Sequence, residues 1–77
     1  MIEQKYERQV QIQLRDFESD GYRVVKDRNS NSVRHIVLWH RANDNMVNIF
    51  ADHKRFQIRI YKNLQLIKTI CLQNKGA

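Results

Sequence analysis

The spacing of apolar residues changes once along this chain, and that change limits the possible folds more than any other feature. Between residues 2 and 19, apolar side chains recur every three or four positions, at Ile2, Tyr6, Val10, Leu14 and Phe17. This spacing forms one apolar stripe along an amphipathic helix. From Tyr22 onward the period falls to two, as in strands whose side chains alternate between two faces. The sequence therefore predicts one helix followed by strands.

Polar, turn-forming residues divide the second part of the chain into short segments. Gly21 suits the left-handed position that follows a helix. Asn and Asp tolerate the same conformation and are common in hairpin turns. We therefore expect strands at 22–26, 33–41, 46–51 and 55–61, a polar loop at 27–32, and turns at 42–45 and 52–54.

The last segment, residues 64–74, fits two structures. As a strand it would place four apolar side chains on one face: Leu64, Leu66, Ile70 and Leu72. As a helix it would begin at the cap Asn63 and stop at Gly76. Its β-branched residues favour the strand slightly. We predict an α+β fold in one domain, residues 1–77, with the N-terminal helix packed on an antiparallel meander of four or five strands.

Both faces of the segment "VRHIVLWHR" are apolar. Ile36 and Leu38 point to one side, and Val33, Val37 and Trp39 point to the other. One helix covers one face of a sheet, so the second apolar face needs another cover. The sequence thus predicts a homodimer.

Composition excludes several classes of protein. With 77 residues, 42% hydrophobic and 29% charged, the chain is too apolar for disorder. No apolar run approaches the ~18 residues of a membrane helix, and no secretory h-region is present. A single cysteine, Cys71, allows no internal disulfide. We therefore expect a cytoplasmic protein without a membrane partner.

The charge is distributed unevenly along the chain. Residues 1–20 carry three basic and five acidic side chains, a net charge of −2, whereas residues 21–77 carry eleven basic and three acidic ones, a net charge of +8. Such asymmetry is typical of proteins that bind polyanions. The sequence predicts a nucleic-acid partner, either DNA or RNA.

The stretch "RFQIRIYKN" (55–63) offers a surface for that partner. Alternation places Phe56, Ile58 and Ile60 on a buried face, and Arg55, Gln57, Arg59 and Tyr61 on the other. Arginine pairs with phosphate oxygens, and aromatic rings stack on unpaired bases. The candidate nucleic-acid-binding residues are Arg55, Arg59 and Tyr61, together with Arg23, Lys26, Arg28 and Arg34 around the polar loop.

The function expected first is that of a small, non-enzymatic nucleic-acid-binding accessory or regulatory protein. An alternative is a protein-interaction module or inhibitor that docks its basic face on an acidic partner. We expect neither catalytic residues nor a cofactor. His35, His40 and His53 lack the spacing of metal ligands, so we also expect no metal site.

The stretch "DGYRVVKDRNSNSVRHIVLWH" (20–40) resembles toxins of the HicA family. Those toxins have a fold like that of double-stranded-RNA-binding domains, and a strand histidine performs the chemistry. The resemblance implies a small ribonuclease with His35 as the acid or base. The family's Gly-Ser-His pattern is absent, because Val33 and Arg34 separate Ser32 from His35.

Overall fold

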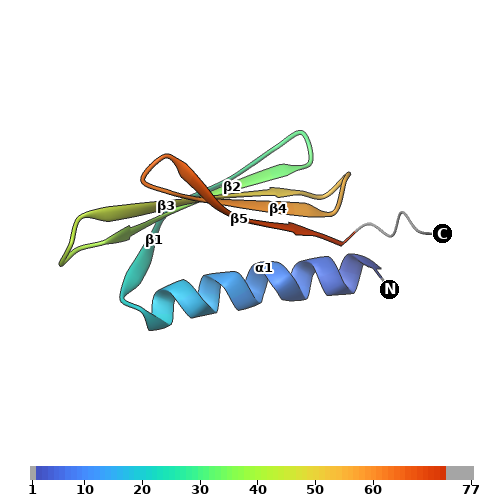
Figure 1. Cartoon of the computed structure of the whole chain (residues 1–77). Coiled ribbons are helices and arrows are strands. Elements are labelled where there is room, and N and C mark those ends of the chain that lie inside the picture. The colour runs from blue at the N-terminus through green and yellow to red at the C-terminus, as the bar shows by residue number, and fades with distance from the viewer. Residues whose placement is uncertain (1, 73–77) are drawn as a thin grey trace.

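A computed structural model describes residues 2–72 and shows one helix lying against one face of a five-stranded antiparallel sheet (Figure 1). The elements are α1 (Ile2–Ser19), β1 (Tyr22–Ser30), β2 (Val33–His40), β3 (Asn45–Asp52), β4 (Gln57–Lys62) and β5 (Gln65–Cys71). Each strand pairs with the next in the chain, in the order β1-β2-β3-β4-β5. The predicted α+β meander is therefore confirmed.

The apolar stripe of α1 packs on the sheet as the sequence predicts. Tyr6 and Val10 are 4% and 1% exposed, and Phe17 packs edge-on against Tyr22 with ring centroids 5.4 Å apart. Gly21 ends the helix with a φ of +99°, and a Cβ there would lie 2.7 Å from His40 Nε2. Both its backbone angle and its surroundings thus require glycine. No helix within residues 2–72 combines the length and apolar character of a membrane span.

The core lies between α1 and the three central strands. Side chains of β2, β3 and β4 that are at most 1% exposed form it: Ile36, Leu38, Val47, Ile49, Ala51, Ile58 and Ile60. Register aligns Ile36, Ile49 and Ile60 in one row across these strands. Ile36 and Leu38 thus face the helix, as alternation predicts.

The predicted loop at 27–32 is wrong. β1 continues through its polar residues to Ser30, and the turn contains only Asn31 and Ser32, with φ values of 49° and 72°. Such two-residue turns with positive φ match the twist of a hairpin. β1 is an edge strand, so its backbone pairs with β2 while polar side chains remain in solvent. A bulge between Val24 and Lys26 changes which side chains face the helix.

The predicted strand 55–61 begins two residues too early. The Asp52 carboxylate accepts hydrogen bonds from the backbone N–H groups of Lys54 and Arg55, at 3.0 and 3.2 Å, and these bonds close a turn. Phe56 completes that turn with a φ of +51°, so β4 starts at Gln57. Arg55 is therefore a turn residue.

Of the two structures expected for 64–74, the strand is found for the described residues, and the helix is wrong. β5 ends at Cys71; residues 73 and 74, and the expected helix stop Gly76, lie outside the described part. The expectation of one apolar face is also wrong. Ile60 pairs with Lys68 but Tyr61 pairs with Leu66, so a bulge moves Leu66 to the face opposite Ile70. Leu64 lies in the preceding turn, with a φ of 71°.

Candidate nucleic-acid interface

The sheet face opposite α1 has no covering element in the described chain (Figure 1). We call it the open face. The pairing register assigns to it the side chains that alternate with the core: Arg23, Lys26, Arg28 and Ser30 from β1, Val33, His35, Val37 and Trp39 from β2, Met46, Asn48, Phe50 and Asp52 from β3, Gln57, Arg59 and Tyr61 from β4, and Leu66, Thr69 and Cys71 from β5. The two aromatic residues that the sequence placed on separate strands, Trp39 and Tyr61, thus share one face.

An aromatic row crosses the middle of the open face. The His35 and Phe50 rings stack with centroids 4.4 Å apart and an angle of 8° between their planes. Tyr61 meets Phe50 edge-on, with centroids 5.7 Å apart and an angle of 89°. His35 Nε2 donates a hydrogen bond of 2.8 Å to Asn48 Oδ1, which fixes the imidazole plane. The row is therefore held by contacts across three strands, and all of its rings remain partly exposed.

Trp39 lies near the end of β2 on the same face. Its indole Nε1 donates a hydrogen bond of 2.9 Å to Asp44 Oδ1 in the following turn. Its neighbour across the strands is Met46, which is 40% exposed. The hydrogen bond limits rotation of the indole while leaving the side chain partly accessible.

Hollows adjoin these rings. One of about 470 Å³ is lined by Gly21, Arg23, Trp39 and Arg41. Another of about 250 Å³ is lined by Asn48, Phe50, Tyr61 and Leu64. A third, of about 390 Å³, is lined by Asp44, Met46, Asn48, Asn63 and Leu64. Asn48 and Leu64 border both the second and the third, which makes these two hollows neighbours on the open face.

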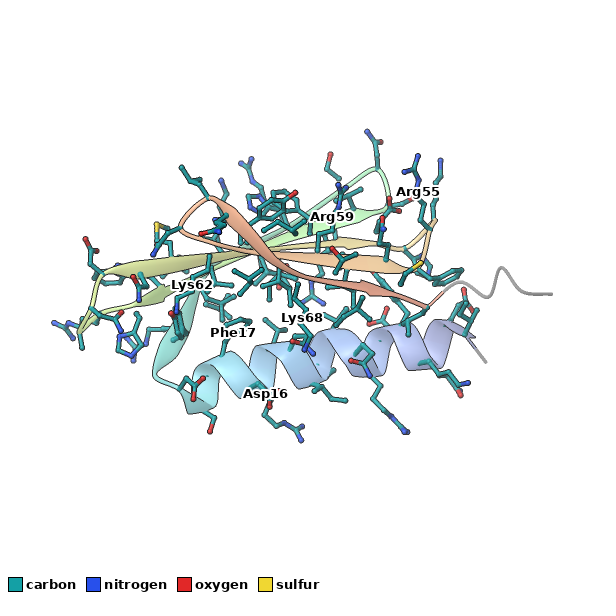
Figure 2. All side chains as sticks on the ribbon, in the orientation of Figure 1. Asp16, Phe17, Arg55, Arg59, Lys62 and Lys68 are labelled. Atoms are coloured by element: carbon teal, nitrogen blue, oxygen red, sulfur yellow. The ribbon has the colours of Figure 1, made fainter. Side chains whose placement is uncertain are left out.

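Positive side chains surround the rings. Arg23, Lys26 and Arg28 are exposed along the β1 edge, and Arg59 is exposed on β4. Figure 2 shows Arg59, and Arg55 from the turn, on the side of the sheet away from α1, whereas Lys62 and Lys68 point toward the helix. No carboxylate of residues 2–72 forms an ion pair with these five cations of the open side. Their charges are available to an anionic ligand.

Arg34 lies apart from this group, so the structure does not bring it together with the other predicted basic residues. It shares the helix-side face of β2 with Ile36. Its Nε and Nη2 donate hydrogen bonds of 2.9 and 2.6 Å to the two carboxylate oxygens of Asp27. The pKa of Asp27 is lowered, first by the hydrogen bond from Arg34, and the same bond raises the pKa of Arg34. The charge of Arg34 is therefore already compensated.

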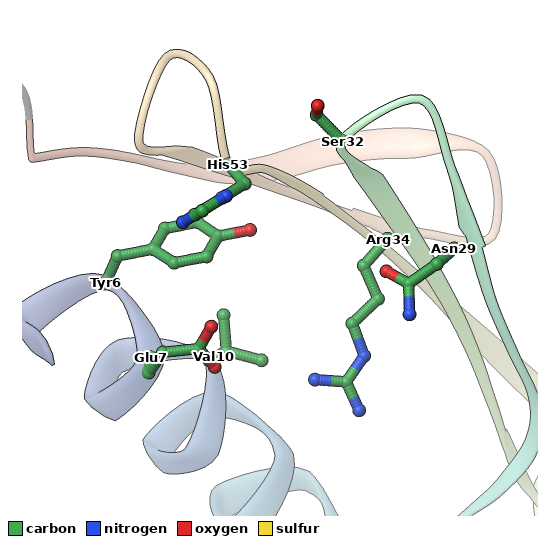
Figure 3. Close-up of a pocket in the computed structure, with 7 residues that line it drawn as sticks. All are labelled: Tyr6, Glu7, Val10, Asn29, Ser32, Arg34 and His53. Carbon is green, nitrogen blue, oxygen red and sulfur yellow. The ribbon is translucent and has the colours of Figure 1, made fainter. Parts of the chain in front are cut away.

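A cleft of about 170 Å³ lies between α1 and the sheet, lined by Tyr6, Glu7, Val10, Asn29, Ser32, Arg34 and His53. Figure 3 shows the Tyr6 hydroxyl entering this space from the helix and the Arg34 guanidinium entering it from the sheet. Burial raises the pKa of Tyr6, and the carboxylate of Glu7 raises it further. The cleft offers an anion little, because its guanidinium is paired with Asp27 and Glu7 lines its wall.

The three histidines lie in different surroundings. His35 belongs to the aromatic row. His40 Nε2 donates to the backbone carbonyl of Asp20 at 3.1 Å and joins the sheet to the end of the helix. His53 Nε2 lies 3.7 Å from Glu3 Oε2 near the start of α1. Within residues 2–72 no three His, Cys, Asp or Glu side chains gather as metal ligands.

Sequence reasoning missed Asn48, Phe50 and Arg41 as members of the site. Phe50 was recognisable as a strand residue, but its contacts with His35 and Tyr61 depend on the register of three strands. The comparisons with known proteins add no functional information, because no protein-family model, curated protein or solved structure matches the chain.

Proposed function

We propose that this chain is a small nucleic-acid-binding protein that contacts phosphates through its open face and has no catalytic activity of its own. The observation that supports this proposal is the combination of five cations without a paired carboxylate and an accessible aromatic row on one side of the sheet. It acts as an accessory or regulatory factor in the cytoplasm, where the exposed thiol of Cys71 stays reduced.

The proposed attraction is electrostatic. Each phosphate that a Lys or Arg neutralises releases condensed counterions, so the logarithm of the affinity falls by ~0.9 for duplex DNA, or ~0.7 for a single strand, per tenfold rise in salt. Five such contacts give a slope between about −3.5 and −4.5. Sequence preference is weak, because phosphate contacts carry no sequence information.

The test is fluorescence anisotropy with labelled DNA and RNA oligonucleotides, single-stranded and duplex, over a range of salt concentrations. The decisive variant combines Arg55→Ala with Arg59→Ala. We expect its salt slope to be shallower than that of the wild type by about 1.4 units for a single strand or about 1.8 for duplex DNA, ~0.7 or ~0.9 for each lost contact. The matched control combines Arg8→Ala with Arg15→Ala, which removes the same charge from exposed positions on α1 and leaves the slope unchanged.

Two outcomes would redirect the proposal. If the wild type binds none of the oligonucleotides at low salt, nucleic-acid binding is wrong, and the alternative of a basic module docked on an acidic protein takes its place. If binding is unchanged in the Arg55 and Arg59 variant, the phosphates are held instead along the β1 edge by Arg23, Lys26 and Arg28.

The ribonuclease alternative has its own test, because His35 lies on the open face. There it stacks on Phe50 and donates to Asn48, which explains its position without catalysis. We expect purified protein to leave RNA intact. RNA cleavage that His35→Ala abolishes without unfolding the domain would replace the present proposal with a HicA-like activity.

A further inference from the structure

We propose that the ligand of the open face is single-stranded nucleic acid whose unpaired bases stack on Trp39 and on the Phe50–Tyr61 pair. This inference rests on the proposed function and specifies its substrate class. The phosphate contacts described above serve single strands and duplexes alike. The rings and the hollows beside them are what distinguish the two.

The rings are suited to stacking because they are both fixed and accessible. Trp39 is held by its hydrogen bond to Asp44; one face of Phe50 is stacked on His35, and Tyr61 meets Phe50 edge-on. All of these rings are partly exposed. A ring that is already ordered loses little conformational entropy when a base stacks on it. Stacking is also tolerant of sequence, since every base has a π-face.

The hollow beside Phe50 and Tyr61 is lined by the Asn48 amide as well as by aromatic carbon. The Oδ1 atom of Asn48 accepts the hydrogen bond from His35, which leaves the amide nitrogen to donate to the edge of a base. A hollow lined by aromatic rings and by one side-chain amide can accept a flat heterocycle that has hydrogen-bonding groups along its edge. Unpaired bases present their Watson–Crick edges, which in a duplex are occupied by the partner strand.

The hollow beside Trp39 supplies a phosphate clamp. Arg23 and Arg41 line it together with the indole. A nucleotide whose base stacks on Trp39 would place its backbone between two guanidinium groups. Arginine suits this position because its fork pairs with two phosphate oxygens at once.

The separation of the two stacking sites indicates how a strand crosses the sheet. Trp39 lies opposite Met46, and Phe50 is four residues further along β3, or about 13 Å at ~3.3 Å per residue. This distance exceeds the ~3.4 Å between neighbouring bases of a stacked strand. The bases at the two sites are therefore separated by other nucleotides, which pass over the hollow beside Met46 and Asn48. The strand runs diagonally from the β1–β2 side to β4.

A duplex cannot use these features. Its bases are stacked on one another, and its major groove admits a helix or a two-stranded ribbon but not the face of a five-stranded sheet. A duplex would touch the flanking cations and leave the rings unoccupied. The open face should therefore bind a single strand more tightly than a duplex that carries the same number of phosphates.

The experiment uses the full chain, a 12-nucleotide oligothymidine, a 12-nucleotide oligouridine and a DNA hairpin with the same number of phosphates, closed by a non-nucleotide linker so that it has no unpaired bases. Trp39 is the only tryptophan, so its emission reports directly on one stacking site. We expect both single strands to quench Trp39 and the hairpin to leave its emission unchanged. In anisotropy titrations, Tyr61→Leu should weaken single-strand binding between about 5- and 150-fold, and leave hairpin binding and the salt slope unchanged. Tyr61→Phe, which keeps the ring, is the matched control and should bind as the wild type does.

The outcomes separate this inference from the proposed function. Equal affinity for single strand and hairpin, with no quenching of Trp39, would overturn the stacking inference and leave phosphate binding intact. No binding of either would overturn both. If Tyr61→Leu does not fold, the quenching of Trp39 and the ratio of the two affinities in the wild type still decide. A second copy of the chain that covers the open face would prevent quenching, and so would also count against the inference.

Discussion

Truncation of Ile58 tests most directly the prediction that the Ile58 and Ile60 side chains form the buried face of β4. Ile58 is fully buried in the middle of β4, between Ala51 on β3 and Ile70 on β5. Ile58→Ala removes three carbon atoms, which at ~0.8 kcal/mol each amounts to about 2.4 kcal/mol of lost apolar transfer. The short side chain of Ala51 cannot fill the resulting space, so a cavity adds to this loss. We expect the free energy of unfolding to fall by about 3 kcal/mol, within the ~2–5 kcal/mol typical of such truncations.

The loss is large for a domain of this size. At ~0.05–0.15 kcal/mol per residue, the whole chain is stable by about 4–12 kcal/mol. Urea unfolding followed by Trp39 fluorescence measures the change, and with an m-value of ~1 kcal/mol/M the midpoint should fall by about 3 M. The control is Ile67→Ala, because Ile67 is 50% exposed in β5 and should lose much less. A midpoint for Ile58→Ala within about 0.3 M of the wild type would show that Ile58 does not face the core.

Two further predictions follow from particular contacts. The pKa of Asp27 is lowered in the folded protein, mainly by the hydrogen bond from Arg34. The pair therefore stabilises the fold at pH values above the unfolded pKa of about 3.9. This stabilisation is lost as the pH falls through the lower pKa of the folded state. In urea unfolding at pH 7, Asp27→Asn should be less stable than the wild type by at most ~1 kcal/mol, because the pair is partly exposed. Near pH 2 the two proteins should be equally stable. A stability difference that grows on acidification would contradict this prediction. The homodimer predicted from the two apolar faces of β2 remains a prediction, and light scattering at tens of micromolar protein tests it. Detection of the 9.3 kDa monomer alone would exclude the dimer. A change of Trp39 emission on dilution would place the dimer contact on the open face.

The parts of the fold that periodicity determines could be predicted from the sequence. The helix at 2–19 and the buried faces of β2 and β4 follow from the spacing of apolar residues alone. The length of β1 could not, because its last residues are polar and are held by backbone pairing with β2. Only the two-residue turn at Asn31 and Ser32, with both residues at positive φ, makes that pairing possible.

The candidate site was predictable in part for a similar reason. Alternation within β4 places Arg59 and Tyr61 together, but it cannot show that the chain turns before Gln57 and removes Arg55 from the strand. Nor can it show that the bulge at Val24–Lys26 turns Asp27 toward the helix side, where it pairs with Arg34. Bulges and turns depend on tertiary contacts, so a period-two pattern does not encode them.

Val37, in the middle of the open face, is already buried without a second copy of the chain. The homodimer was predicted because Val33, Val37 and Trp39 form a second apolar face, yet Val37 is only 7% exposed in the single chain. Its cross-strand neighbours are Lys26 and Asn48, and long basic side chains can cover apolar surface with their methylene stems. What remains accessible is ring faces, an amide and cationic groups, beside the aliphatic side chains of Met46, Leu64 and Leu66, which are 40%, 90% and 48% exposed. The rings, the amide and the cationic groups each have a counterpart in a nucleotide: the base plane, the base edge and the phosphate.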